Sequence, residues 1–140
     1  MKEKQKKRKE ADLGKKKKSN IDAAVIDSLR HPQDTIWLRD HLNALIIGVD
    51  APVMARFNRI LARGRESDPK TWEEFLAADL RDRGIGQPEY GDNVEACLKI
   101  ARESGRIIEN VGSQRDLESK LQEILNSYGI EGNPKSKENR

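Results

Sequence analysis

The sequence has only one cysteine, Cys97, in its 140 residues. A single cysteine excludes an intramolecular disulfide and a zinc site built from a cysteine cluster. It is compatible with a reducing compartment, so we expect a cytoplasmic location, or a nuclear one if the source is eukaryotic. We expect Cys97 to be a buried structural thiol, because Val94, Leu98 and Ala101 share its face of a predicted helix.

Long apolar runs and aromatic residues are scarce as well. No stretch approaches the roughly 20 apolar residues that cross a bilayer, and the N-terminal segment lacks the apolar core of a signal peptide. We therefore expect no membrane partner. Hydrophobic residues make up 35% of the chain and aromatic residues 4%. Because this composition supplies only a modest core, we leave open a homo-oligomer that buries additional surface.

Patterns that would carry catalysis are missing. The stretch GIGQPEYGD at 84–92 contains glycines but no GK[ST] element, which argues against a phosphate-binding loop. His31 and His41 are ten positions apart and share no metal-ligand spacing. The carboxylates around 73–82 alternate with arginines, which is typical of helix caps and surface pairs. We predict a non-enzymatic protein with no catalytic residue, no metal and no cofactor.

Positive charge, by contrast, is concentrated near the N-terminus. Residues 1–18 contain ten basic and three acidic side chains, whereas residues 19–140 contain 17 basic and 21 acidic ones. Clustered cations bind phosphates by releasing condensed counterions, with little preference for sequence. The arm residues that we predict to contact nucleic acid are Lys6, Lys7, Arg8, Lys9, Lys15, Lys16, Lys17 and Lys18. A merely solubilising tail has the same composition, and that alternative stays open.

Beyond the arm, capping residues, apolar positions at helical spacing and glycines recur in a regular order, which is typical of helices. The predicted fold class is all-α. We expect a bundle of about five or six short helices over 20–130, a disordered Lys-rich arm at 1–19 and a disordered polar tail at 131–140. The expected helices are 20–30, 35–47, 51–63 and three more that begin behind Thr71, Asp92 and Ser113.

Capping patterns mark the ends of these helices. In a capping box, the side chains at the first and fourth positions bind each other's backbone N–H groups. Three pairs fit this pattern: Thr71 with Glu74, Asp92 with Glu95, and Ser113 with Asp116. Asp34 is the expected cap of 35–47, and Gly64 is the expected left-handed residue after 51–63.

Two short β-branched runs complicate the helical prediction. ALIIGV at 44–49 and RIIENV at 106–111 are each short enough to be a strand. We favour helix for the first run because it continues a 3.6-residue pattern. The second stays undecided, since Gly105 either ends a helix before it or lies inside one that reaches Val111.

The predicted helix 51–63 is amphipathic and carries an arginine stripe. Its apolar side contains Val53, Met54, Phe57, Ile60 and Leu61. Arg56, Arg59 and Arg63 lie together on a different side, and we predict that they contact nucleic acid.

The stretch 44–65 also resembles the helix-turn-helix pattern. The resemblance rests on small Ala44, then Gly48 and apolar Val49, then Met54 and Phe57 at the spacing of inward-facing positions. It implies a first helix ending near Ile47, a short turn, and a recognition helix that presents Arg56 and Arg59 to a groove. The alternative is two core helices joined by a glycine turn, with the arginines in solvent.

Taken as a whole, the sequence predicts a non-enzymatic protein associated with nucleic acid. The basic arm and the arginine face would contact phosphates of DNA or RNA. The alternative is a protein-interaction adaptor or an accessory subunit of a larger complex, whose partner is a protein. In that case an exposed Trp37 or Trp72 would be a typical binding anchor.

Overall fold

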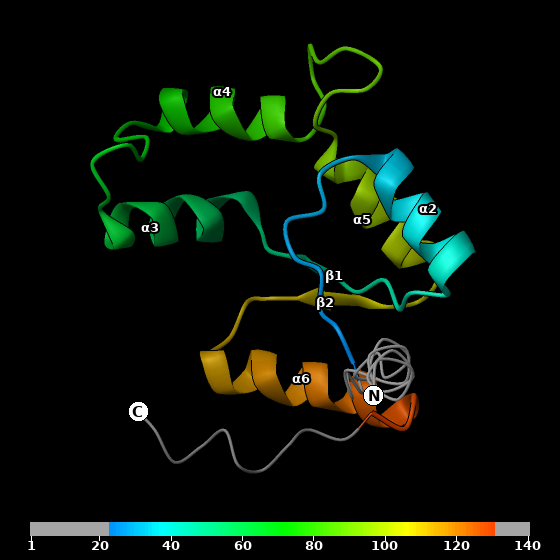
Figure 1. Cartoon of the computed structure of the whole chain (residues 1–140). Coiled ribbons are helices and arrows are strands. Elements are labelled where there is room, and N and C mark those ends of the chain that lie inside the picture. The colour runs from blue at the N-terminus through cyan, green and yellow to red at the C-terminus, as the bar shows by residue number, and fades with distance from the viewer. Residues whose placement is uncertain (1–22, 131–140) are drawn as a thin grey trace, which may run out of the picture.

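The computed structural model describes residues 23–130. In chain order they form α2 (Pro32–Leu42), β1 (Gly48–Asp50), α3 (Val53–Arg63), α4 (Trp72–Asp82), α5 (Val94–Glu103), β2 (Ile107–Glu109) and α6 (Gln114–Ser127) (Figure 1). The described part is mostly helical. It is not all-α as predicted, because two short segments pair as strands.

β1 and β2 form a parallel sheet of two strands, with Gly48 opposite Ile107. The Gly48 N–H donates to the Arg106 carbonyl at 2.9 Å, and the Asn110 N–H donates to the Asp50 carbonyl at 2.7 Å. Three helices lie between the strands in the chain, as expected for a parallel connection, which needs a long crossover. The run at 106–111, which the sequence left undecided, therefore contains a strand.

The helix preferred for 44–49 is wrong, because α2 ends at Leu42 rather than near residue 47. Asn43 follows with a left-handed φ of 51°, a conformation that asparagine tolerates better than most residues. Ile46 and Ile47 then lead into β1, which contains Val49, and such β-branched side chains suit extended backbone.

The first predicted helix is also wrong in its described part, because residues 23–31 are not helical (Figure 1). Ser28 has a φ of 62°, and its N–H is bound by the Asp27 carboxylate at 2.6 Å. Val25 and Ile26 would lie on the apolar face of the predicted helix, but in the structure they do not cover a core, and Val25 is 94% exposed.

Several predicted helix ends are confirmed. Thr71 with Glu74 caps α4 and Ser113 with Asp116 caps α6, both as reciprocal capping boxes. Gly64 follows α3 with a φ of 62°, as expected for a left-handed residue at this position.

Two predicted caps are wrong. α5 is capped by Asn93, whose side chain accepts the Ala96 N–H at 2.9 Å, rather than by Asp92. α2 begins at Pro32, so Asp34 lies within its first turn instead of preceding it. Proline supplies this start because its fixed φ suits the first helical position.

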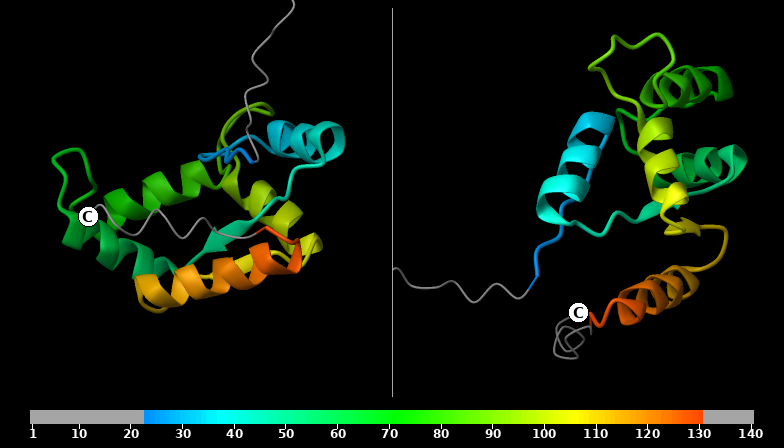
Figure 2. Two further views of the ribbon diagram at one scale, coloured as in Figure 1. Left: turned by 60° about the horizontal axis from the view of Figure 1, so that its bottom comes forward. Right: turned by 90° about the vertical axis from the view of Figure 1, so that its right-hand side faces the viewer.

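α5 is the central element of the core. It packs against α2 and both strands, and the strands lie between α5 and α6 (Figures 1 and 2). The buried apolar residues are Leu38, Ile46, Phe75, Cys97, Leu98, Ile100, Ala101 and Ile108. The prediction of a buried Cys97 is thus confirmed, and its sulfur accepts a hydrogen bond from the Thr35 hydroxyl at 3.4 Å.

α3 and α4 pack on each other through aromatic rings. The Phe57 centroid lies 5.2 Å from that of Phe75 and 5.4 Å from that of Trp72. Both separations fall in the range of favourable aromatic pairs. Within residues 23–130, the helices are too short or too polar to span a bilayer.

Candidate functional site

The predicted nucleic-acid contacts fall into two groups. Those of the arm, from Lys6 to Lys18, lie outside the described residues. Arg56, Arg59 and Arg63 lie on α3, which is the one helix of the described part without an acidic side chain. The structure gives these three arginines three different partners.

Arg56 turns toward α4. Its guanidinium donates to the Asp79 carboxylate, and its Nε donates to the Ala51 carbonyl at 3.0 Å. The Arg56 side chain is 24% exposed and that of Asp79 is 12% exposed. Arg56 therefore ties α3 to α4 and to the end of β1.

Arg59 and Arg63 lie on the exposed surface of α3. The Arg59 Nη2 donates to the Asn110 carbonyl at 2.7 Å, just beyond the end of β2. Arg63 makes two hydrogen bonds to the Asp68 carboxylate, at 2.9 and 2.5 Å. The bond from Arg63 is the main cause that lowers the pKa of Asp68. Within the described residues, the charge of Arg59 faces a neutral carbonyl and that of Arg63 faces a carboxylate.

The helix-turn-helix arrangement is not formed. Its first helix would have to continue to residue 47, but α2 ends at Leu42 and residues 43–52 separate it from α3. The expected turn at Gly48 is instead a strand, because its backbone pairs with β2. α3 therefore has no preceding helix in the position that the motif requires.

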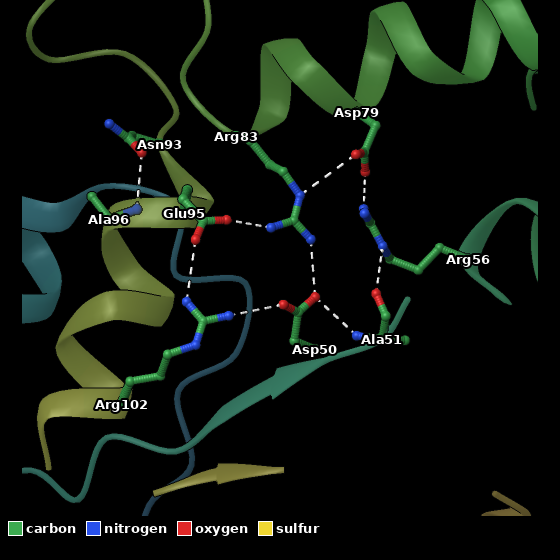
Figure 3. A network of polar contacts seen from close by, with 9 residues as sticks. All are labelled: Asp50, Ala51, Arg56, Asp79, Arg83, Asn93, Glu95, Ala96 and Arg102. Carbon is green, nitrogen blue, oxygen red and sulfur yellow. Dashed lines mark hydrogen bonds and ion pairs between the residues drawn. The ribbon is translucent and has the colours of Figure 1, made fainter. Parts of the chain in front are cut away.

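A ring of four charged side chains lies at the carboxyl end of β1 (Figure 3). Asp50 accepts from Arg83 at 2.9 Å and from Arg102 at 3.1 Å. Glu95 accepts from the same two arginines, and its bond with Arg102 measures 3.1 Å. The ring joins β1, the end of α4 and α5, and the sequence does not predict it.

The ring extends through Asp79 to α3. Arg83 Nε lies 3.5 Å from the Asp79 carboxylate, which also binds Arg56 (Figure 3). The complete network holds three carboxylates, Asp50, Asp79 and Glu95, and three guanidiniums, Arg56, Arg83 and Arg102. Its formal charges balance, so it attracts an external anion less than the arginines alone would.

The pKa values fit this balance. Partial burial alone would raise the pKa of Asp50, but the Ala51 N–H and the Arg83 guanidinium hold it below its ordinary value. Partial burial alone would lower the pKa of Arg83, but hydrogen bonds and charges of Asp50 and Glu95 raise it. Both groups stay charged near neutral pH, which suits a structural network better than proton transfer.

A cleft of about 320 Å³ adjoins this network. Its lining residues are Asp50, Ala51, Pro52, Arg102, Ile107 and Glu109. Asp50 and Arg102 already bind each other, so neither offers the cleft an uncompensated charge. Within the described residues, no three histidine, cysteine or acidic side chains gather closely enough to hold a metal ion.

Among the described residues, the polar and stacking contacts of the two histidines involve none of the network residues. His31 Nδ1 lies 3.3 Å from the Gly91 carbonyl, and its Nε2 lies 3.7 Å from the Asp92 carboxylate. The His41 ring stacks on Trp37 with a centroid distance of 5.0 Å. Trp37 is 50% exposed, whereas Trp72 is half-buried against Phe57.

Sequence reasoning misses the network because its members come from distant segments. The spacing of Asp79 and Arg83 is the one local signal, since residues four apart on a helix are neighbours. The sequence alone favours a surface contact for that pair. Nothing local connects Asp50 to Arg102.

The chain is similar to several proteins named UPF0200 protein. That of Pyrococcus horikoshii is 37% identical over 65 residues, which are 44% of this chain and 35% of the relative. That of Methanocaldococcus jannaschii is 29% identical over 107 residues, covering 74% of this chain and 49% of the relative. That of Thermococcus gammatolerans is 30% identical over 104 residues, covering 72% and 50%.

The chain therefore spans about half the length of these relatives, or less. The names of the relatives state no activity, substrate or partner. No family model matches the chain, and no solved structure matches it.

Proposed function

We propose that this protein associates with nucleic acid without acting as an enzyme, and that it does so in the cytoplasm or the nucleus. The Lys-rich arm provides electrostatic attraction to phosphates, and the exposed arginines of α3 provide a second contact. DNA and RNA both fit this chemistry, because phosphate contacts carry little sequence information.

The charge distribution of α3 carries this proposal. Each other helix of the described part mixes acidic and basic side chains or is acidic, whereas α3 has three arginines and no acid. Arg65 continues the positive charge just after the helix, and its backbone N–H is bound by Asp68. A local excess of positive charge on an otherwise acidic body is the distribution expected of an electrostatic contact.

The contacts of the three arginines support Arg59 more than Arg56 or Arg63 as the proposed nucleic-acid contact. Arg56 forms a largely buried ion pair with Asp79, so we exclude Arg56 from the proposed interface. Arg59 is the leading residue, because its neutral partner leaves its charge available to a phosphate. Arg63 would have to exchange Asp68 for a phosphate, which makes its contribution smaller.

The proposal is tested by fluorescence anisotropy of labelled duplex DNA, single-stranded DNA and RNA across a salt series. The logarithm of the affinity should fall linearly with the logarithm of salt concentration, with a slope of about 0.9 per phosphate neutralised in duplex DNA. Changing Arg59 and Arg65 to Glu should weaken binding more than changing Arg39 and Arg115 to Glu. The two double variants alter net charge equally. Equal losses of affinity would therefore mean that binding depends on net charge and not on a site at Arg59 and Arg65.

A second experiment isolates the arm. Changing Lys15, Lys16, Lys17 and Lys18 to Gln removes four positive charges without shortening the chain. If the arm holds phosphates, the salt slope on duplex DNA should become shallower by about 0.9 for each phosphate that the arm no longer neutralises. An absence of binding at low salt by the unaltered protein contradicts the proposed function.

The second candidate is an accessory subunit or adaptor that binds another protein. One observation favours it: Trp37 is half-exposed on α2, and a tryptophan in this position is a typical anchor of an interface. Exchanging Trp37 for Ala should then weaken binding to a protein partner and leave the anisotropy titrations unchanged. The converse result would favour nucleic acid.

A further inference from the structure

One edge of β1 has no strand beside it in the described part of the chain. The Gly48 N–H and the Asp50 carbonyl both point to β2. In a parallel ladder, the residue between two such residues directs its backbone groups to the other side, so those of Val49 face the free edge. Unpaired donors and acceptors on a strand edge are a template for a further strand.

A cavity of about 260 Å³ lies along this edge. Residues 26–29 line one side of it, 46–49 line another, and α5 contributes Val94, Cys97, Leu98 and Ala101. Of its few polar side chains, the Asp27 carboxylate accepts the Ser28 N–H and the Thr35 hydroxyl donates to the His31 carbonyl. Small-molecule sites need convergent polar groups to orient a ligand. This cavity suits an apolar segment better.

A large apolar side chain remains exposed on each of two sides of the cavity. Ile26 is 56% exposed and Val49 is 49% exposed, and Val25, next to Ile26 in the chain, is 94% exposed. Single exposed apolar residues are ordinary on a protein surface, but exposed apolar residues that face one groove from two sides are typical of an interaction site. An inserted segment would cover these side chains and pair with the Val49 backbone at the same time.

The sheet itself is incomplete by ordinary standards. Parallel sheets usually have more strands and are covered on both faces, and an isolated pair of strands is marginal in water. The relatives are at least about twice as long as the part that matches this chain. They therefore contain residues that are available to provide further strands.

We propose that a β-strand inserts between residues 23–29 and β1, and that this strand comes from polypeptide corresponding to the unmatched part of the UPF0200 relatives. It is uncharged and rich in β-branched residues, because both faces of an internal parallel strand are covered. The inference rests on the accessory-subunit function and not on nucleic-acid binding. Strand insertion can therefore fail while nucleic-acid binding holds, and nucleic-acid binding can fail while strand insertion holds.

The first measurement is hydrogen exchange of the full chain alone, resolved at single amides by NMR. The amides of Gly48 and Asn110 should be protected, since both are bound within the sheet, whereas the Val49 amide should exchange rapidly. A Val49 amide as protected as that of Gly48 means that the edge is already covered, which overturns the proposal.

The second measurement is co-expression of the full chain with the unmatched part of the Methanocaldococcus jannaschii relative, followed by co-purification and titration. A one-to-one complex in which the Val49 amide becomes protected supports the proposal. Absence of a complex overturns it, and so does a dimer of this chain alone that protects the same amide.

Two proline variants locate the binding edge. Val49→Pro removes the N–H on the free edge of β1, and Glu109→Pro removes an N–H of β2 that points away from β1. Val49→Pro should weaken the complex about ten-fold or more, whereas Glu109→Pro should not. Equal binding by both variants means that the partner docks elsewhere, in which case the accessory function survives and strand insertion does not.

A second pair of variants does not depend on β1 tolerating proline. Ile26→Asp places a charge in the groove from a non-helical segment, and Ile85→Asp places one on a similarly exposed loop residue elsewhere. Loss of the complex only with Ile26→Asp supports insertion beside residues 23–29. Binding by Ile26→Asp as strong as that of the unaltered chain overturns it.

Discussion

Arg83 donates a hydrogen bond from Nη2 to Oδ1 of Asp50, which lies 33 positions earlier in the chain, at 2.9 Å. This contact connects the end of α4 to the end of β1. Because Arg102 binds the other oxygen of Asp50, the strand end is held from two helices at once. Asp50 therefore links β1 to the end of α4 and to α5.

Asp50→Ala should destabilise the protein by about 1–3 kcal/mol. The reason is that the partly buried Arg83 and the half-exposed Arg102 both lose a charged hydrogen-bond partner. The free energy of unfolding is measured by urea denaturation. Asp40→Ala is the matched control, since it removes an exposed carboxylate that binds only its neighbour Arg39 among the described residues. Equal losses in the two variants would mean that the ring contributes nothing beyond a surface pair.

The protein should lose stability below about pH 4. The pKa values of Asp50, Asp68 and Asp116 all lie below their ordinary value in the folded state, whereas an unfolded aspartate titrates near about 3.9. The unfolded chain thus binds more protons at acid pH, so the stabilisation is present above pH 4 and is lost as pH falls through the folded pKa values.

Urea titrations at a series of pH values measure this dependence. Asp50→Asn should give a shallower loss between pH 4 and pH 2 than the unaltered protein, since one of the carboxyls with a lowered pKa no longer titrates. Identical slopes would show that the folded pKa of Asp50 is not depressed.

Gly48→Ala should destabilise the protein by about 1–3 kcal/mol, because a methyl group at this position overpacks the core. A Cβ on Gly48 would lie 2.6 Å from the Ile107 Cδ1 and 2.9 Å from the Ala101 Cβ. Val49→Ala on the same strand alters a half-exposed side chain and should change the free energy of unfolding much less. A neutral Gly48→Ala would mean that α5 can move away from the strand.

The Cys97 thiol should react slowly with a disulfide reagent at pH 8 in the folded protein. Burial raises its pKa, which reduces the fraction present as thiolate, and the side chain is buried on α5 beside Thr35 of α2. The rate should rise by about ten-fold or more in denaturing urea, where an ordinary cysteine has a pKa near about 8.5. Equal rates with and without urea would contradict the burial of this thiol.

Signals that act within one turn could be predicted from the sequence. Thr71 and Ser113 satisfy backbone N–H groups three residues away, so their identity and spacing alone indicate where α4 and α6 begin. Gly64 ends α3 for a similarly local reason, since it adopts a left-handed conformation at little cost. Such residues need no distant partner to exert their effect.

The strands could not be predicted in the same way. The run at 44–49 fits a helix when only near neighbours are considered. Its strand forms because Gly48 and Val49 pair with Ile107 and Ile108, which lie beyond three helices. Asn43 is the local signal that could have corrected the prediction, because it favours a left-handed turn after α2.

The arginine positions on α3 could be predicted from the sequence, but their partners could not. The position of Arg56, Arg59 and Arg63 on one side of α3 follows from helical spacing. Which of them reaches solvent does not, because Arg56 is turned inward by Asp79 of α4 and Arg59 is bound by the end of β2. A single sequence contains no record of those interactions.

The placement of α3, α4 and α5 between the two strands also fixes an order of events during translation. A chain emerges from the ribosome N-terminus first, at about 5–20 residues per second. The aromatic contacts between α3 and α4 involve residues close in sequence, so this hairpin can form before β2 has left the ribosome. β1 cannot pair until Ile107 is available. In the nascent protein both edges of β1 are therefore exposed to chaperones or to a partner strand.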